Sequence, residues 1–457
     1  MQKLLAWIDE RFPATKVWEE HVSKYYAPKN FNFWYYFGSL AMVVLVIQIL
    51  SGIFLTMHYK PDTGLAFASV EYIMRDVPWG WLIRYLHSTG ASFFFIVVYL
   101  HMFRGLMYGS FKGPRELVWI IGMVIFIALM AEAFMGYLLP WGNMSYWGAQ
   151  VIISLFDAIP LVGPALSEWI RGDFVVADAT LNRFFSLHVI AVPLLLLVLV
   201  FLHIVALHKV GSNNPDGVDI KKKKDAKGVP LDGIAFHPYY TVKDTVGTVV
   251  FLMFFSAVVF FTPEVGGWFL EHDNFVPANI LNTPPDIKPL WYFTPFYSIL
   301  RATTEELVRF GLIPFVVLLA ALTVVSIRNI KAKAVTILAA VVLLVGFLML
   351  EAKVWGVVLM GLSLVLFFFL PWLDRSPVKS IRYRGWMYKT TLGIFVVSFV
   401  VLGFLGTRNP GHVDLILFQN VRWAQVLTVV YFMFFLLMPW VSTYDKTKPI
   451  PERVTWK

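Results

Sequence analysis

The chain has 457 residues, of which 58% are apolar, 17% aromatic and only 15% charged, whereas a soluble domain usually carries about 25% charged residues. Stretches of about 20 residues with almost no charge recur, and each is long enough to cross the hydrocarbon layer of a bilayer. The composition therefore excludes an ordinary soluble protein and predicts an all-α, polytopic transmembrane helical bundle. The chain has no cysteine, which excludes disulfides and thiolate-bound clusters, so any metal site must use His, Met, Asp or Glu.

Ten apolar segments are predicted to span the membrane. They are residues 33–56, 84–106, 117–139, 181–206, 245–262, 309–327, 334–350, 354–373, 390–406 and 422–441. The amphipathic segment before them, residues 1–32, lacks the pattern of a signal peptide and is expected to lie on the membrane surface. The apolar segment 143–170 is interrupted by Pro160 and Pro164, so it is expected to form two surface helices instead of an eleventh span.

Basic residues predict the orientation of these spans. With both termini on the cytoplasmic side, the inner loops hold 26 Lys and Arg residues and the outer loops hold 7, as the positive-inside rule requires. An eleventh span would place the run Lys221 to Lys224 on the opposite side from Lys112 and Arg115. The net charge of +9 thus reflects topology and contact with anionic membrane lipids, and no nucleic-acid partner is expected.

Two of the predicted spans carry histidines at matching depths. His87 and His101 are fourteen residues apart in the second span, and His188 and His203 are fifteen apart in the fourth. Each pair lies on roughly one helix face, about 21–22 Å apart along the axis. The two spans run in the same direction, so His87 pairs with His188 towards the outside and His101 with His203 towards the inside. Facing imidazoles bind six-coordinate haem, so the pattern predicts two stacked haems, although a single membrane histidine is more often a hydrogen-bonded core residue.

Glycines and arginines give further signals. Gly38 and Gly52 in the first span, and Gly122 and Gly136 in the third, are also fourteen apart. They fall at the inner and outer histidine levels, where a macrocycle requires close backbone approach, although small residues also serve ordinary helix packing. Three arginines near the ends of the histidine-bearing spans are candidates to bind haem propionates, with snorkelling as the alternative: Arg84, Arg104 and Arg183.

Several short motifs are more specific than spacing alone. They include Arg84-Tyr-Leu-His87, His101-Met-Phe-Arg104-Gly, Gly136-Tyr-Leu-Leu-Pro-Trp-Gly142, Arg183-Phe-Phe-Ser-Leu-His188, Gly211-Ser-Asn-Asn-Pro215 and Pro289-Leu-Trp-Tyr292. Together they resemble cytochrome b of the cytochrome bc complex (complex III), in its bacterial type. The resemblance covers most of the chain from about residue 32 to 302 and resumes near residue 353.

The resemblance implies a subunit of quinol–cytochrome c oxidoreductase in the bacterial inner membrane. His87 and His188 would bind the low-potential haem b, and His101 and His203 the high-potential haem b. Ubiquinol would be oxidised near the outer haem, with one electron leaving to a Rieske iron–sulfur protein. The other would cross both haems and reduce ubiquinone at an inner site, coupled to proton translocation. Cytochrome c1 would be a further partner, and the complex would be a homodimer.

The family's quinol-oxidation site maps by resemblance onto residues that all lie outside in the predicted topology: Tyr137, Gly148, Pro289, Trp291 and Tyr292. The usual family motif has Glu where this chain has Leu290, which puts the role of that Glu in doubt here. We predict that Glu132, within the third span near its outer end, accepts the quinol proton instead. The alternatives are a structural hydrogen bond for Glu132 and a hydrogen-bonding role for Tyr292.

The inner quinone site maps by resemblance onto His208 and the pair Lys243-Asp244, with Ser39 as a further candidate. An imidazole and a carboxylate can hydrogen-bond the two quinone carbonyls and deliver protons. Taken alone, Lys243-Asp244 would be an ordinary charged start of a helix.

Two departures from the family pattern are expected to change the fold locally. Residues 303–352 have no counterpart in the common pattern and are expected to form an extra transmembrane hairpin. The fifteen-residue spacing in the fourth span exceeds the usual fourteen, and Pro193 between the ligands predicts a local bulge.

The expected parts are a surface segment (1–32), a haem-binding domain (33–262), an outer loop (263–302), the hairpin (303–352) and a C-terminal domain (353–457).

Two other classes of function remain open from the residues alone. A different dihaem membrane anchor would pass electrons between quinone and a soluble dehydrogenase, and it would lack the long outer loop. A proton-coupled transporter would use intramembrane His and Glu, but transporters usually show inverted repeats and broken helices at the midplane. No such repeat is evident in this sequence.

Overall fold

The computed structural model describes residues 2–326 and 329–455. Within these residues, ten helices are long and apolar enough to cross a membrane, so the ten predicted spans and the all-α class are confirmed. Seven of the spans are single helices: α3 (Tyr36–Thr56), α5 (Gly80–Tyr108), α6 (Glu116–Leu138), α11 (Tyr239–Phe261), α16 (Ala352–Leu373), α17 (Trp386–Gly406) and α18 (Asn420–Tyr444). The others are the α9–α10 helix and the two helices of a hairpin.

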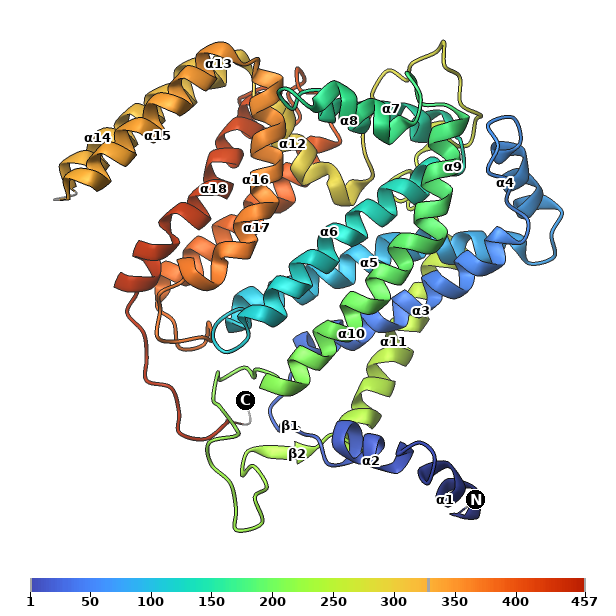
Figure 1. Ribbon diagram of the computed structural model, residues 1–457, viewed down its shortest axis with the longest axis vertical. Coiled ribbons are helices and arrows are strands. Elements are labelled where there is room, and N and C mark those ends of the chain that lie inside the picture. Colours follow the sequence, from blue (N-terminus) through green and yellow to red (C-terminus); the bar gives the residue numbers. More distant parts are fainter. Residues whose placement is uncertain (1, 327–328, 456–457) are drawn as a thin grey trace.

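The spans form two groups with a shared core. In the first group α3 packs along α5, α6 packs along α10, and α11 packs against α3 and α5 (Figure 1). In the second group the short helix α12 (Thr294–Ala302) packs against α16, α17 and α18. One buried cluster joins the groups, because it includes Phe95 of α5, Phe126 of α6, Tyr292 of the outer loop and Phe434 of α18.

The helix that carries His188 and His203 contains a π-helical turn at Leu187–Ala191. This turn lies between α9 (Asp178–Ser186) and α10 (Val192–Val210), and Pro193 follows it. A π turn accommodates one extra residue without breaking the helix, and proline next to it leaves one fewer backbone N–H to satisfy. The turn takes up the fifteenth residue of the spacing, so the predicted bulge is confirmed.

The segment between α6 and α9 contains two short helices, α7 (Asn143–Phe156) and α8 (Gly163–Arg171). Neither is among the ten candidate spans of the described residues, as predicted from the two prolines.

Further short elements are α1 (Gln2–Asp9), α2 (Ala14–Trp18) and α4 (Ala66–Arg75). Strands β1 (Tyr26–Pro28) and β2 (Gly233–Ala235) pair antiparallel and join the N-terminal segment to the loop before α11.

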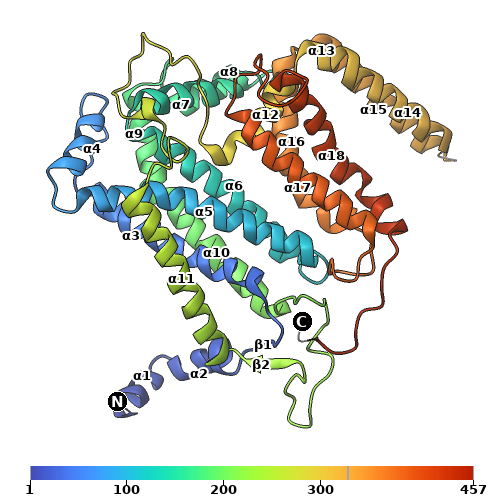
Figure 2. The ribbon, with the colours of Figure 1, turned by 180° about the vertical axis from the view of Figure 1, so that it is seen from behind.

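The segment 303–352 forms a helical hairpin that extends away from the rest of the bundle (Figures 1 and 2). Its first arm consists of α13 (Glu305–Leu307), a π turn at Val308–Leu312 and α14 (Ile313–Ser326), and its second arm is α15 (Ile330–Met349). The two arms pack against each other. Most of their large apolar side chains are exposed in the isolated chain, as is usual for surfaces that face lipid. Residues 327 and 328, where the predicted span 309–327 ends, lie outside the described residues.

A buried ion pair joins loops at the end of the bundle that carries both chain ends (Figure 1). The Arg384 side chain is fully buried, and its Nη2 lies 2.5 Å from Oδ2 of Asp374. Nζ of Lys112, in the loop after α5, lies 3.0 Å from Oδ1 of the same carboxylate. Asp374 thus neutralises two cations and joins the α5–α6 loop to the α16–α17 loop.

We expect Asp374→Ala to destabilise the protein by about 3–5 kcal/mol, because it leaves a buried guanidinium without its anion. The measurement is unfolding of the purified protein in mixed micelles as denaturing detergent is added. Glu452→Ala is the control, since it removes the exposed Lys223–Glu452 pair, whose N···O distance is 2.8 Å. That change should cost no more than about 1 kcal/mol, and equal losses in both variants would contradict the assignment.

Candidate functional site

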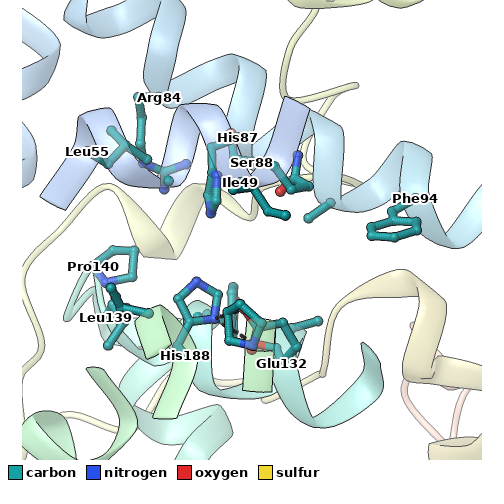
Figure 3. A pocket seen from close by; sticks show the side chains of 18 of the residues that line it. Ile49, Leu55, Arg84, His87, Ser88, Phe94, Glu132, Leu139, Pro140 and His188 are labelled. Carbon is teal, nitrogen blue, oxygen red and sulfur yellow. Dashed lines mark hydrogen bonds and ion pairs between the residues drawn. The ribbon is translucent and has the colours of Figure 1, made fainter. Parts of the chain in front are cut away.

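The four histidines of the second and fourth spans face each other in two pairs. The ring centroids of His87 and His188 are 6.1 Å apart, with their planes at 87° (Figure 3). Those of His101 and His203 are 6.4 Å apart at 63°. A metal ion bonds an imidazole nitrogen at about 2 Å, so two imidazoles on opposite sides of one ion place their ring centroids roughly 6 Å apart. Both pairs have the separation that a bis-imidazole metal requires.

The glycines of α3 and α6 lie directly against these rings. A Cβ atom on Gly52 would lie 3.2 Å from Cε1 of His87, and one on Gly136 would collide with the His188 ring. Each glycine faces one imidazole: Gly38 faces His101, Gly52 faces His87, Gly122 faces His203 and Gly136 faces His188. The absence of a side chain at each glycine therefore leaves room for a histidine ring. The four glycines lie at the depths of the two histidine pairs, as their spacing predicts.

A cavity of 350 Å³ opens between the outer pair of rings, which is within the size range of small-molecule sites. Its lining includes His87, His188, Gly52 and Gly136, together with Arg84. Among the described residues no group of three or more His, Asp and Glu side chains could hold a metal ion by itself. Paired imidazoles, a glycine-lined approach and an apolar cavity fit a haem.

The three arginines differ in where their side chains lie. Arg84 lines the outer cavity. Nη2 of Arg104 lies 3.5 Å from Nδ1 of His101, and its Nε is buried without a hydrogen-bond partner, so it is placed to meet an anionic group there. Arg183 instead donates a hydrogen bond to the backbone oxygen of Trp169 and packs on Gly172, away from the His188 ring.

A buried carboxyl group that the sequence analysis missed lies beside the outer cavity. Oε2 of Glu271 accepts a hydrogen bond of 2.7 Å from the hydroxyl of Tyr137, which itself lines the cavity. Glu271 is only 4% exposed, and this burial raises the pKa of its carboxyl from 4.5 to about 7, although the Tyr137 hydrogen bond opposes the shift. A pKa near 7 suits a group that accepts a proton at physiological pH.

Glu132 also lines the outer cavity, but its carboxylate points to a histidine. Oε1 of Glu132 lies 3.0 Å from Nδ1 of His188, and Figure 3 shows the two side chains next to each other. Its other oxygen, Oε2, is buried without a hydrogen-bond partner. The assignment of Glu132 as the quinol proton acceptor therefore stays a prediction, and Glu271 is a second candidate for that role.

Among the remaining predicted residues of the outer site, Tyr292 lines the cavity, and Trp291 and Gly148 contact residues that line it. The Tyr292 ring stacks on Phe95 with centroids 3.9 Å apart, and Leu290 and Tyr292 both line the cavity. The Trp291 indole donates a hydrogen bond of 3.1 Å to the Ser92 hydroxyl. Pro289 precedes this turn in the loop, and Gly148 of α7 lies against the Tyr137 ring, because a Cβ there would be 3.7 Å from Cε1.

The predicted inner-site residues come from three helix ends. His208, in the last turn of α10, stacks on Tyr25 with ring centroids 4.7 Å apart. Nζ of Lys243 lies 4.7 Å from the ring centroid of Tyr239, and Asp244 follows it in the second turn of α11. Ser39 near the start of α3 donates its hydroxyl to a backbone oxygen of its own helix.

Two protein-family models match the chain. The model described as "Cytochrome b/b6/petB" matches residues 22–211, and the model described as "Cytochrome b(C-terminal)/b6/petD" matches residues 277–432. The first match spans all four histidines and the four glycines. The second spans the end of the outer loop and most of the C-terminal group of helices.

Full-length relatives and a solved structure agree with these matches. The chain is 56% identical over 455 residues to cytochrome b of Allochromatium vinosum, covering 99% of this chain and 98% of that protein. It is 39% identical over 452 residues to a protein of Bradyrhizobium diazoefficiens named cytochrome b/c1, covering 99% of this chain and 56% of that longer protein. A chain of a solved structure called "Hyperthermophilic respiratory Complex III" has a TM-score of 0.77 and 36% identity, with 96% and 98% of the two chains covered.

We expect Gly136→Ala to abolish haem binding by the outer histidine pair, because the added methyl group would collide with the His188 ring. The measurement is the reduced-minus-oxidised absorbance spectrum of the purified protein, which should lose about half of its b-type signal. Gly361→Ala on α16 is the matched control, since a Cβ there meets nothing within 4 Å. A full spectrum in Gly136→Ala would contradict the expected geometry.

Proposed function

The chain belongs to the cytochrome b family, and we propose that it oxidises quinol at an outer site and reduces quinone at an inner site as the dihaem subunit of complex III. Membership of this family sets aside the transporter and the unrelated dihaem anchor. The observation that carries the proposal is the pair of facing imidazole couples at two depths of one four-helix core, with ring centroids 6.1 and 6.4 Å apart.

We assign the outer couple His87–His188 to one haem b and the inner couple His101–His203 to the other. Bound there, the two groups would supply stepwise single-electron transfer across the membrane. The chain itself keeps each imidazole in place through the glycine opposite it. Arg84 and Arg104 are positioned to hold anionic propionate groups at the outer and inner levels, and the contacts of Arg183 give it no such position.

Quinol oxidation would take place beside the haem held by His87 and His188, at the part of the cavity wall that Leu290 and Tyr292 form. Leu290, Tyr292 and the rings around them form an apolar wall that would hold the quinol ring and exclude water. Glu271 is the proton acceptor that we propose, because its carboxylate already accepts a hydrogen bond from Tyr137 and burial brings its pKa to about 7.

The inner site is proposed at the opposite end of the helices. The His208 imidazole and the Asp244 carboxylate would each hydrogen-bond one quinone carbonyl and deliver a proton. Lys243 would keep positive charge near the reduced ring, and Ser39 would offer a hydroxyl at the same level. The stacking of Tyr25 on His208 fixes the plane of that imidazole.

The same assignment supports proposals for the partners and for the orientation in the membrane. The Bradyrhizobium relative is named cytochrome b/c1, and we propose that a separate cytochrome c1 serves this chain. We also propose a Rieske iron–sulfur protein as the acceptor of the first electron and a homodimeric complex. The excess of Lys and Arg in one set of loops supports a cytoplasmic position for both termini.

The proposal is tested by spectroscopy and turnover together. Purified protein should show two b-type haems per chain in the reduced-minus-oxidised spectrum, and membranes should reduce cytochrome c when ubiquinol is supplied. Substituting His188 should remove one haem and stop turnover. A purified chain that carries no haem would refute the proposal.

We expect the rate of quinol oxidation to rise with pH through about 7, because only the ionised Glu271 carboxylate can accept a proton and its pKa is about 7. Glu271→Gln should lower the rate by about 100-fold or more and remove this dependence. The measurement is the pH profile of ubiquinol–cytochrome c turnover in membranes. Asp286→Asn, which changes an exposed carboxylate of the same loop, should leave the profile unchanged.

Tyr137→Phe should move the rise in the pH profile to higher pH. The hydroxyl of Tyr137 donates to the Glu271 carboxylate and lowers its pKa, so its removal should raise that pKa further. The same turnover assay checks the direction of the shift. A rise that stays in place, or that moves to lower pH, would contradict the link between Tyr137 and Glu271.

A further inference from the structure

Glu132 is a carboxylic acid inside a membrane span, where such a residue is costly and usually has a function. Its side chain is 15% exposed, and Oε1 lies 3.0 Å from Nδ1 of His188. The backbone oxygen of Glu132 lies 2.9 Å from the same Nδ1. One N–H therefore faces two acceptors of one residue, while Oε2 is buried without a hydrogen-bond partner. The contact of the Glu132 carboxyl group is thus with the histidine.

The other three imidazoles have different neighbours at Nδ1. The Ser51 hydroxyl lies 3.0 Å from Nδ1 of His87. A guanidinium nitrogen of Arg104 lies 3.5 Å from Nδ1 of His101, and Nδ1 of His203 is buried without a hydrogen-bond partner. Of the four, His188 is the one whose Nδ1 contacts a carboxylate. The outer pair thus has a carboxyl group at Nδ1 of one ligand, whereas the inner pair has a guanidinium group at Nδ1 of one ligand.

We infer that Glu132 is a positioning residue for the outer haem, acting through His188. Its carboxylate and backbone oxygen hold the proton of the His188 ring on Nδ1, so that Nε2 is the nitrogen left free to bind a metal. A carboxylate that accepts this proton also makes the imidazole a more basic ligand. A more basic ligand stabilises oxidised iron over reduced iron, so Glu132 lowers the reduction potential of the outer haem.

This inference rests on the proposed function, because it needs a haem between His87 and His188. The inferred effect comes from the contact between Glu132 and the His188 ring. It does not depend on the net charge of the cavity, to which Arg84 contributes a positive charge. The inference also separates the two carboxyl groups of the outer site. Glu271 contacts a tyrosine hydroxyl at the cavity wall, whereas Glu132 contacts an imidazole N–H.

The test is a redox titration of the intact complex in which the absorbance of each b haem is followed. Glu132→Gln keeps the shape and an acceptor oxygen but cannot carry a negative charge. We expect the reduction equilibrium of the outer haem to shift about tenfold towards the reduced form, which is about 59 mV for one electron. The inner haem should keep its potential, and the electron paramagnetic resonance signal of the oxidised outer haem should change.

Two further variants make the result decisive. Glu116→Gln removes a carboxylate from the first turn of the same helix, at its opposite end, and should leave both potentials unchanged. Glu132→Asp keeps the charge and should stay closer to the original potential than Glu132→Gln does. If Glu132→Gln loses the outer haem and Glu132→Asp retains it, the positioning role is supported.

Three results would overturn the inference. The first is that the reduction potential of the outer haem in Glu132→Gln equals that in the unaltered protein, with both haems present. Glu132→Asp could shift the potential as far as Glu132→Gln, or lose the haem with it, which would assign the effect to packing instead of charge. Glu132→Gln could abolish the pH dependence of quinol oxidation at unchanged potential, which would make Glu132 the proton acceptor. If the unaltered complex contained no haem, the proposed function itself would fail.

Discussion

The structure depends on one geometric constraint, which is that two parallel helices must hold four imidazoles in two facing couples inside an apolar bundle. Each couple is fixed at a ring separation near 6 Å, since the centroid distances are 6.1 and 6.4 Å. The neighbouring helices then have little freedom. Their glycines lie against the rings, and a Cβ at Gly52 or Gly122 would come within 3.2 Å of an imidazole carbon. The positions of the four histidine rings therefore restrict how closely, and at which residues, the four helices of this core can pack.

Features that repeat along one helix could be predicted from the sequence. Ten apolar stretches, the histidine spacings and the glycine spacings depend on periodicity alone, and ten candidate spans are found among the described residues. Even the irregular spacing of the fourth span was informative, since fifteen residues require an adjustment that fourteen do not. The adjustment is the π turn at Leu187–Ala191, which includes His188.

Features that join distant segments could not be predicted in the same way. Tyr137 and Glu271 are 134 residues apart and meet because the outer loop folds back over α6. The sequence marks Glu271 as one acid in a polar loop, and no spacing rule assigns it to the cavity. For Glu132 the sequence indicates an unusual carboxyl group within a span but not the direction of its side chain. A rotation of that side chain decides whether the carboxyl group faces a bound quinol or His188.

The replacement of the family's usual glutamate by Leu290 has a physical consequence for the outer site. Leu290 is 6% exposed and belongs to the same apolar cluster as Tyr292, so this wall can hold a ring but cannot accept a proton. A proton acceptor must then come from another segment that borders the cavity and is buried enough to have a pKa near neutrality. Glu271 meets both conditions, whereas Glu132 is already engaged with His188. The two carboxyl groups can thus have separate roles, because Glu132 contacts a ring within the cavity and Glu271 contacts the hydroxyl of Tyr137 in its wall.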